Sequence, residues 1–239
     1  MRHLLPTATS ADERGRSAKA AILPIGSFEQ HGDYLPLMTD TIVASAICAE
    51  LSSSYPLLHL PPMTISCSQE HSAWPGTVSI SSRTLTAVIE DVACSLTCSE
   101  IPALVLVNGH GGNYVIGNIV QEANARGTRM ALFPSGEDWK EARAAAGLQT
   151  TMHEDMHAGE LETSLLMHTW PEMVRDGYES ADWLCNDRRH LLTRGMAPYT
   201  SSGVIGRPSL GSADKGKAIL ASLVQSFADV LSALAAHPD

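Results

Sequence analysis

The sequence predicts an α/β fold in which helices cover both faces of a mainly parallel sheet. Short apolar segments alternate along the chain with longer segments whose apolar residues recur at helical spacing. That alternation is typical of parallel strands with helices packed on either face. Since no internal repeat, low-complexity tract or linker divides the 239 residues, we expect a flexible leader at 1–19 and a single domain over 20–239.

Four short apolar segments are predicted to be strands. In 103–107 every residue is apolar, as expected of a strand that is buried on both faces. The segment 57–60 ends at two prolines, Pro61 and Pro62. The other two predicted strands are 20–26 and 128–133.

Six segments are predicted to be helical, and 40–54 shows why. Its apolar residues Ile42, Val43, Ala46 and Leu51 recur at the spacing of one helix face. The six segments are 40–54, 82–100, 114–126, 136–146, 156–170 and 213–236. The long connections 63–80 and 171–210 are predicted to be irregular and to shape a pocket, because long loops in compact domains tend to carry function.

Composition excludes several classes of partner. The formal net charge is −10, whereas nucleic-acid binding and adsorption to anionic membranes both need a basic surface. No apolar run reaches the roughly 18 residues of a membrane span, and the first 19 residues lack the apolar core of a signal peptide. The five cysteines have no CxxC spacing, so we interpret them as buried thiols of a reduced, cytoplasmic protein.

The first candidate site follows the first predicted strand. Glu29 and His31 are two residues apart, so their side chains leave an extended segment on the same side. Asp40 can add a second carboxylate. Carboxylates and imidazoles directed at one point are typical metal ligands, and we interpret these three residues as a candidate metal site.

A second candidate, Asn108-Gly109-His110-Gly111-Gly112-Asn113, follows the strand 103–107. Its glycines allow a tight turn that exposes His110, and Asn113 is placed to cap the next helix. Ligands of open parallel sheets bind at the carboxyl ends of the strands, so His110 is expected at the same sheet edge as Glu29 and His31. Taken alone, the motif is equally explained as a plain glycine-rich turn.

The third candidate is His157-Ala158-Gly159-Glu160, followed by Glu162, at the start of a helix. Acidic residues are common at helix N-termini because they complement the helix dipole, and this explains Glu160 on its own. The explanation is weaker for His157 and Glu162 when they are considered together with the other two motifs.

Together these motifs resemble the creatininase (creatinine amidohydrolase) family. The resemblance runs in order over residues 20–170, and it is specific for the family but not for a substrate. It rests on Pro24–Gly32, Leu35–Thr41, Glu70–Ser79, Val107–Asn113 and His157–Ser164.

The resemblance implies a three-layer αβα sandwich with a two-metal centre that hydrolyses C–N bonds. Carried over by motif, Glu29 and His110 bind one ion, His31 binds the other and Asp40 bridges both. His157 is the general acid and base. The two ions are expected to be Zn²⁺, with Mn²⁺ or Fe²⁺ as alternatives, because the ligands are oxygen and nitrogen atoms without thiolate. They would activate a water for attack on the amide carbonyl.

One departure from the family lies after His110, where creatininase proper has a glutamate ligand. This chain has Gly111 and Gly112 there. The second ion therefore needs a carboxylate from elsewhere. Glu162 is our candidate for that ligand and for a catalytic role, with Glu160 as the alternative. The departure also argues against creatinine as the substrate.

The substrate pocket is predicted to involve residues of the second motif and of the 63–80 connection. These residues are His71, Trp74, Gly111, Gly112 and Asn113. As a single loop histidine, His71 is equally explained as a surface residue.

The predicted function is that of a metal-dependent amidohydrolase acting on a cyclic amide, a formamide or a small peptide-like substrate in a biosynthetic or degradative pathway. The alternatives are a metallopeptidase that trims a peptide precursor, an enzyme of the same fold that forms a C–N bond, and a non-catalytic scaffold. Family resemblance adds a homo-oligomer, often a hexamer.

Overall fold

The structure is a computed structural model that describes residues 5–236, so the ends of the predicted leader and of the domain lie outside the described residues. Its sheet has four parallel strands in the order β2-β1-β3-β4. The strands are β1 (Ala21–Ile25), β2 (Leu58–His59), β3 (Ala103–Asn108) and β4 (Arg129–Phe133). Each falls within or close to a predicted strand, and the prediction of an α/β fold with a parallel sheet is confirmed.

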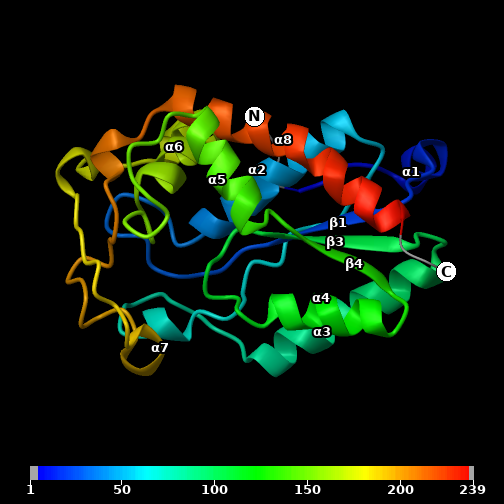
Figure 1. The fold of residues 1–239 in the computed structure, drawn as a ribbon, viewed down its shortest axis with the longest axis horizontal. Helices are drawn as coiled ribbons and strands as arrows, with labels where there is room; N and C mark the ends of the chain where they lie inside the picture. Colours follow the sequence, from blue (N-terminus) through cyan, green and yellow to red (C-terminus); the bar gives the residue numbers. More distant parts are fainter. Residues whose placement is uncertain (1–4, 237–239) are drawn as a thin grey trace.

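Helices cover both faces of the sheet, which gives three layers (Figure 1). One layer consists of α2 (Thr39–Ser54), α5 (Gly136–Ala145), α6 (Glu160–Thr169) and α8 (Ala213–Ala235). The other consists of α3 (Ser82–Cys98) and α4 (Ile116–Ala125). The side chains of β3 alternate between these layers: Val105 and Val107 join the core under the first layer, and Leu104 and Leu106 join the core under the second. Both faces of the strand are therefore buried, as its apolar sequence predicts.

The predicted leader contains a short helix, α1 (Ser10–Arg16). The Thr9 side chain accepts a hydrogen bond from the Asp12 amide, and the Asp12 carboxylate accepts one from the Thr9 amide. This capping box stabilises the first turn. The Arg16 guanidinium donates to the carbonyl oxygen of Leu57 at 2.7 Å, which attaches α1 to the sheet layer just before β2.

The prediction that all five cysteines are buried is wrong. Cys48 and Cys67 are buried, but Cys94 and Cys98 are exposed on α3, and Cys185 is half-buried. The helical spacing of Cys94 and Cys98 places both on the outer side of that helix, away from the sheet.

The helix α8 is long and apolar enough, by length and composition alone, to span a membrane, although the sequence was expected to contain no such run. It packs against α2, α5, α6 and β4. Ile219, Leu223 and Phe227 are buried on its inner face, as in a core helix of a globular domain.

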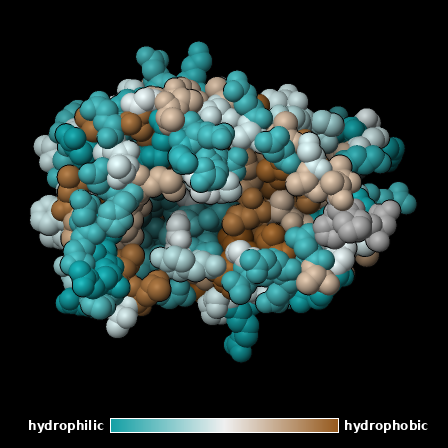
Figure 2. All heavy atoms as spheres, viewed as in Figure 1, coloured by the Kyte–Doolittle hydropathy of each residue, from teal (hydrophilic) through white to brown (hydrophobic). Residues whose placement is uncertain are grey.

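The two long connections contain only short helical turns. These are η1 (Gln69–His71), η2 (Pro171–Met173), η3 (Tyr178–Ser180), α7 (Leu191–Arg194) and η4 (Pro208–Leu210). The surface drawn in Figure 2 has a hollow lined mostly by hydrophilic residues, beside a hydrophobic patch at the place where Figure 1 draws the edge strand β4.

Candidate metal centre

The three sequence motifs meet at the carboxyl ends of β1 and β3. Ile25 lies opposite Asn108 at the ends of these strands, and the Gly109 amide donates to the Ile25 carbonyl oxygen at 2.8 Å. This pairing brings the loop that carries Glu29 beside the turn that carries His110. A side chain at Gly109 would overlap the backbone carbonyl of Asp40, so only glycine allows α2 to approach this closely.

Asp40 lies in the first turn of α2, between two histidines. Its Oδ1 is 3.0 Å from His31 Nε2, and its Oδ2 is 3.0 Å from His110 Nδ1. The Ser27 hydroxyl donates to Oδ2 at 2.6 Å. Each carboxylate oxygen therefore faces one imidazole nitrogen, which is the arrangement a bridging ligand needs.

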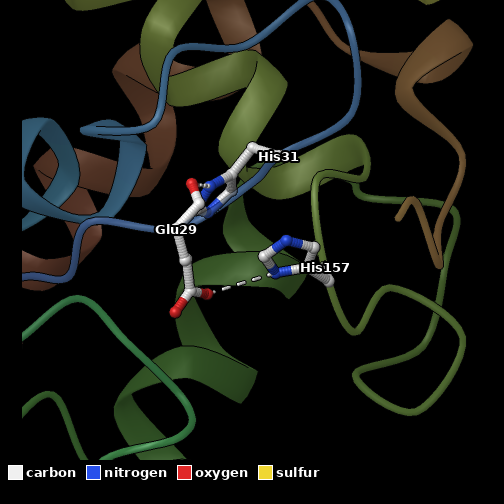
Figure 3. A group of neighbouring side chains, drawn as sticks. All are labelled: Glu29, His31 and His157. Carbon is white, nitrogen blue, oxygen red and sulfur yellow. Dashed lines mark hydrogen bonds and ion pairs between the residues drawn. The ribbon is translucent and has the colours of Figure 1, made fainter. Parts of the chain in front are cut away.

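The Glu29 carboxylate is fully buried, and neither of its oxygens accepts a hydrogen bond. Three imidazole nitrogens nevertheless surround Oε1: His71 Nε2 and His110 Nδ1 at 3.2 Å, and His157 Nδ1 at 3.8 Å (Figure 3 shows the contact with His157). A buried carboxylate that accepts no hydrogen bond raises the free energy of the folded protein. A cation bound between Glu29 and its neighbours would satisfy it.

Backbone carbonyls fix the orientation of three of these histidines. His31 Nδ1 faces the Glu29 carbonyl oxygen at 3.0 Å, His110 Nε2 faces that of Cys67 at 2.7 Å, and His157 Nε2 faces that of Gln30 at 2.6 Å. Since a carbonyl only accepts, each of these nitrogens carries the hydrogen. The opposite nitrogen of each ring points toward the carboxylates, and once it has lost its proton it can bind a metal ion, as in sites whose histidines are held by second hydrogen bonds.

His71 has the opposite orientation. The Gln30 side-chain oxygen accepts from the Gly32 amide, so the Gln30 NH₂ group faces His71 Nδ1 at 2.9 Å and donates to it. His71 Nε2 then carries the hydrogen and points at the Glu29 carboxylate. His71 is buried, so its interpretation as a surface residue is wrong. Its geometry suits orientation of Glu29 rather than ligation.

The structure separates the two candidate glutamates. Glu162 Oε2 is 4.0 Å from His31 Nε2 and accepts from the Ala158 amide at 2.6 Å. Glu160 instead accepts hydrogen bonds from Thr150 and from the Lys215 ammonium group, whose Nζ lies 2.6 Å from Oε1. Its carboxylate therefore joins α6 to α8, and Glu162 is the glutamate of the two that lies beside His31 in the candidate centre.

The backbone that positions Glu162 is unusual. Ala158 has a φ of +53°, a conformation that is uncommon for residues other than glycine, and the Tyr34 hydroxyl donates to its carbonyl oxygen. This turn places His157 on one side of the site and directs the Ala158 amide toward Glu162 on the other. Such local strain is often found where side chains must be held at a functional site.

Two groups of three residues have ligand atoms close enough to hold one cation each. They are Glu29, Asp40 and His110, and His31, Asp40 and Glu162; within each group the ligand atoms lie within 4.8 Å of one another. Both groups contain Asp40. A third group, Glu29, His31 and His157, overlaps them. Buried oxygen and nitrogen ligands without thiolate fit Zn²⁺ or Mn²⁺. The described residues thus suit a two-cation centre with Asp40 as the shared ligand.

The charges of this cluster shift several pKa values. Burial opposes the charged form of His31, but the adjacent Asp40 carboxylate outweighs it and raises the pKa of His31 to about 9. Burial, with the negative charge of Asp40, raises the pKa of Glu162 to about 8. Burial and the positive charge of His31 hold the pKa of His157 well below its usual range. His157 is therefore a neutral imidazole at pH 7.

These shifts predict that cation binding becomes tighter as the pH rises. Below about pH 8, His31 and Glu162 hold protons that a divalent cation must displace, so the metal-free protein should release protons on binding. Between pH 8 and pH 6, we expect each displaced proton to lower the affinity for Zn²⁺ by about tenfold per unit fall in pH. Competition with a chelating dye of known affinity measures this, and an affinity that does not change over that range would contradict it.

Asp40, His110, His157 and Glu162 of this cluster line a cavity of about 550 Å³, whereas Glu29 and His31 are buried behind them. Of the residues predicted to contact substrate, His71, Gly111 and Gly112 lie on its wall. Trp74 and Asn113 are not among the lining residues.

The Asn113 side chain has a structural role. Its Oδ1 accepts from the Cys67 amide at 3.2 Å, and its Nδ2 donates to Asn108 at 3.0 Å. The predicted helix cap is wrong, because α4 begins at Ile116 without a side-chain cap. Trp74 is half-buried, and its ring packs near that of His71, with a centroid distance of 6.3 Å. Trp74 therefore contacts a neighbour of the centre but not the cavity.

Several lining residues could not be found from the sequence. They are Tyr114, His153, Met156, Asn186–Arg189 and Leu191. His153 stands in none of the motifs, so no pattern marks it. Most of the other lining residues come from the 171–210 connection, where neither hydrophobic periodicity nor a motif marks them.

Gly112 leaves room for the side chains around His110. A Cβ atom there would overlap Glu70 Oε1 and His110 Nε2. Gly112→Ala should therefore displace the His110 ring and weaken cation binding at the Glu29 and His110 side of the centre by about tenfold or more. Gly111→Ala is the matched control, because a Cβ atom at Gly111 meets nothing within 4 Å. Equal metal content in the two variants, measured by mass spectrometry of bound metal, would contradict this role.

Comparison with known proteins identifies the family. The model of the creatininase family, described as creatinine amidohydrolase, matches residues 6–231. The chain belongs to the creatininase family. It is 34% identical over 232 residues to a mycofactocin precursor peptide peptidase of Mycobacterium ulcerans, and the match covers 91% of this chain and 86% of that protein. A creatinine amidohydrolase of Pseudomonas putida is 26% identical over 227 residues, covering 88% of this chain and 87% of that one.

Solved structures agree on the fold. A crystal structure of creatinine amidohydrolase matches with a TM-score of 0.80 at 23% identity, over 98% of this chain and 97% of that chain. Two further creatininase structures, one named as a Zn-Zn type and one as an Mn form, also match with a TM-score of 0.80. The predicted family, the fold and the class of enzyme, a hydrolase acting on C–N bonds, are confirmed.

Proposed function

We propose that this chain is a metal-dependent peptidase that hydrolyses an amide bond of a peptide-like substrate at a two-cation centre. The observation that supports it best is the pair of ligand groups that share Asp40 beneath the cavity, beside the neutral imidazole of His157. A peptide substrate is favoured over creatinine because the peptidase relative is the more similar of the two reported and because Gly111 and Gly112 follow His110.

Five side chains would hold the cations. Glu29 and His110 would bind one, His31 and Glu162 the other, and Asp40 both. Zn²⁺ is our first expectation and Mn²⁺ the second. When bound, such cations lower the pKa of a shared water and polarise the amide carbonyl.

His157 would move the proton of the reaction. Its Nε2 hydrogen is held by the Gln30 carbonyl, so Nδ1 is free to accept a proton from the attacking water and to donate it to the leaving nitrogen. The Glu29 carboxylate, 3.8 Å from Nδ1, would stabilise the protonated imidazole during the transfer. His71, whose Nε2 lies 3.2 Å from the Glu29 carboxylate, would keep that carboxylate oriented.

The test is a comparison of substrates with and without cations. Protein loaded with Zn²⁺ or Mn²⁺ is incubated with a synthetic mycofactocin precursor peptide, with creatinine and with a formamide, and the products are measured by mass spectrometry. We expect cleavage of the peptide, its loss on chelation and its return when the cation is restored. Faster hydrolysis of creatinine or of the formamide would replace the peptide by a small amide as the substrate class. Cleavage that survives full chelation would contradict the metal mechanism.

Two further expectations concern location and assembly. We propose from the cysteine spacing that the protein is cytoplasmic, and from the family resemblance that it forms a homo-oligomer, with a hexamer as the expected state. Light scattering after size-exclusion chromatography measures the second, and a monomer at micromolar concentration would contradict it.

A further inference from the structure

One wall of the cavity is formed by Asn186–Arg189 and Leu191, and this wall is attached to the rest of the site. The Trp183 amide donates to the Gly206 carbonyl oxygen at 2.9 Å. His153 Nε2 donates to the Asn186 carbonyl oxygen at 2.8 Å. The wall is therefore fixed beside His153, four residues before His157.

The charged groups of this wall are not equivalent. Arg189 is exposed and forms an ion pair with Asp187 through two contacts of 3.0 and 3.2 Å. Arg188 is half-buried. Its guanidinium contacts the carbonyl oxygens of Cys185 and His153 and the ring nitrogen Nδ1 of His153. Among the described residues, no carboxylate forms an ion pair with Arg188.

A half-buried guanidinium without a carboxylate is an incomplete anion site. Burial lowers the pKa of Arg188, while the planar group still has N–H donors beyond its contacts with Cys185 and His153. A carboxylate fits such a planar group through paired N–H···O contacts, and a peptide substrate offers carboxylates. Glu70, another charged side chain of the cavity wall, lies 3.8 Å from His110 Nε2 through its Oε1 and forms no ion pair with Arg188.

We propose that Arg188 binds a carboxylate of the substrate and thereby selects acidic peptides over neutral ones. This proposal rests on the proposed peptidase function, since it names the substrate group that the cavity recognises. The carboxylate comes either from the C-terminus of a short peptide or from an acidic side chain near the cleaved bond. Both sources present the same planar anion to the same guanidinium.

The experiment measures binding rather than turnover. Holoenzyme and its Arg188→Gln variant are titrated calorimetrically with three probes: N-acetyl-dialanine with a free carboxylate, the same dipeptide amidated, and an amidated N-acetyl peptide with a glutamate side chain. Because coordination of a carboxylate to the cations is common to both proteins, the difference between the proteins reports the contribution of Arg188. We expect the loss of Arg188 to weaken one of the two anionic probes by about tenfold or more and to leave the neutral probe unchanged.

The probe that weakens identifies the source of the carboxylate. Arg188→Lys should weaken the same probe less, because it keeps the charge but not the paired contacts. Arg126→Gln is the control. Arg126 is an exposed arginine at the end of α4, and it forms an ion pair with Glu90 of α3. Equal affinities of wild type and Arg188→Gln for both anionic probes would overturn the proposal, as would an equal loss for the neutral probe. A holoenzyme that binds the probes as expected but cleaves no peptide would contradict the proposed function alone.

Discussion

Replacement of Asp40 by alanine is expected to remove most of the bound metal and to abolish hydrolysis. Both oxygens of this carboxylate face imidazole nitrogens at 3.0 Å, and both cation groups contain it. Its loss therefore leaves each cation with two protein ligands instead of three. We expect turnover to fall to the background of the assay and metal content, measured by mass spectrometry, to fall from two equivalents toward zero.

The control for Asp40→Ala is Asp33→Ala, which removes an exposed carboxylate nearby. Circular dichroism of both variants checks that the fold persists. Near-normal metal content in folded Asp40→Ala would remove Asp40 from the centre. Loss of only one equivalent would mean that the residue is a ligand of one cation and not a bridge.

Replacement of His157 by alanine is expected to have a different effect: both cations stay, and turnover falls by roughly 10²–10⁴-fold, the usual contribution of general acid–base catalysis. His157 lies near Glu29 but takes part in neither of the two groups that share Asp40. Its neutral imidazole, held by Gln30, is suited to carry a proton. Single-turnover rates and metal content measure the two effects separately.

His190→Ala is the control for this variant, because His190 is an exposed histidine outside the lining residues of the cavity. A fall in metal content of His157→Ala by one equivalent would make His157 a ligand, through its group with Glu29 and His31. Unchanged turnover would place the proton transfer on another residue.

The predictable part of this molecule is the part that periodicity and strand order determine. The apolar run of β3 predicts burial on both faces, and parallel pairing then places His110 beside the loop after β1. The positions of Glu29, His31 and Asp40 at that edge then follow from where β1 ends and α2 begins, and the sequence marks both places. The meeting of these side chains at one point is thus largely predictable.

The remaining parts depend on contacts that no local pattern records. Asn113 looks like a helix cap, but its side chain pairs with Cys67 and Asn108, which are brought to it by the fold. His71 is buried because Gln30, 41 residues earlier, donates to it. The wall around Arg188 belongs to an irregular segment, held by backbone contacts to His153 and Gly206. Contacts of this kind join residues that are far apart in the sequence, so only the tertiary structure reveals them.

The most direct test of the two-cation centre is a crystal structure of protein grown with Zn²⁺ or Mn²⁺, with anomalous data collected at the absorption edge of the metal. We predict two anomalous peaks about 3.5–4 Å apart, one against Glu29 and His110, the other against His31 and Glu162, with Asp40 between them. A cluster without peaks, or a single peak that leaves Asp40 in contact with one cation only, would contradict it.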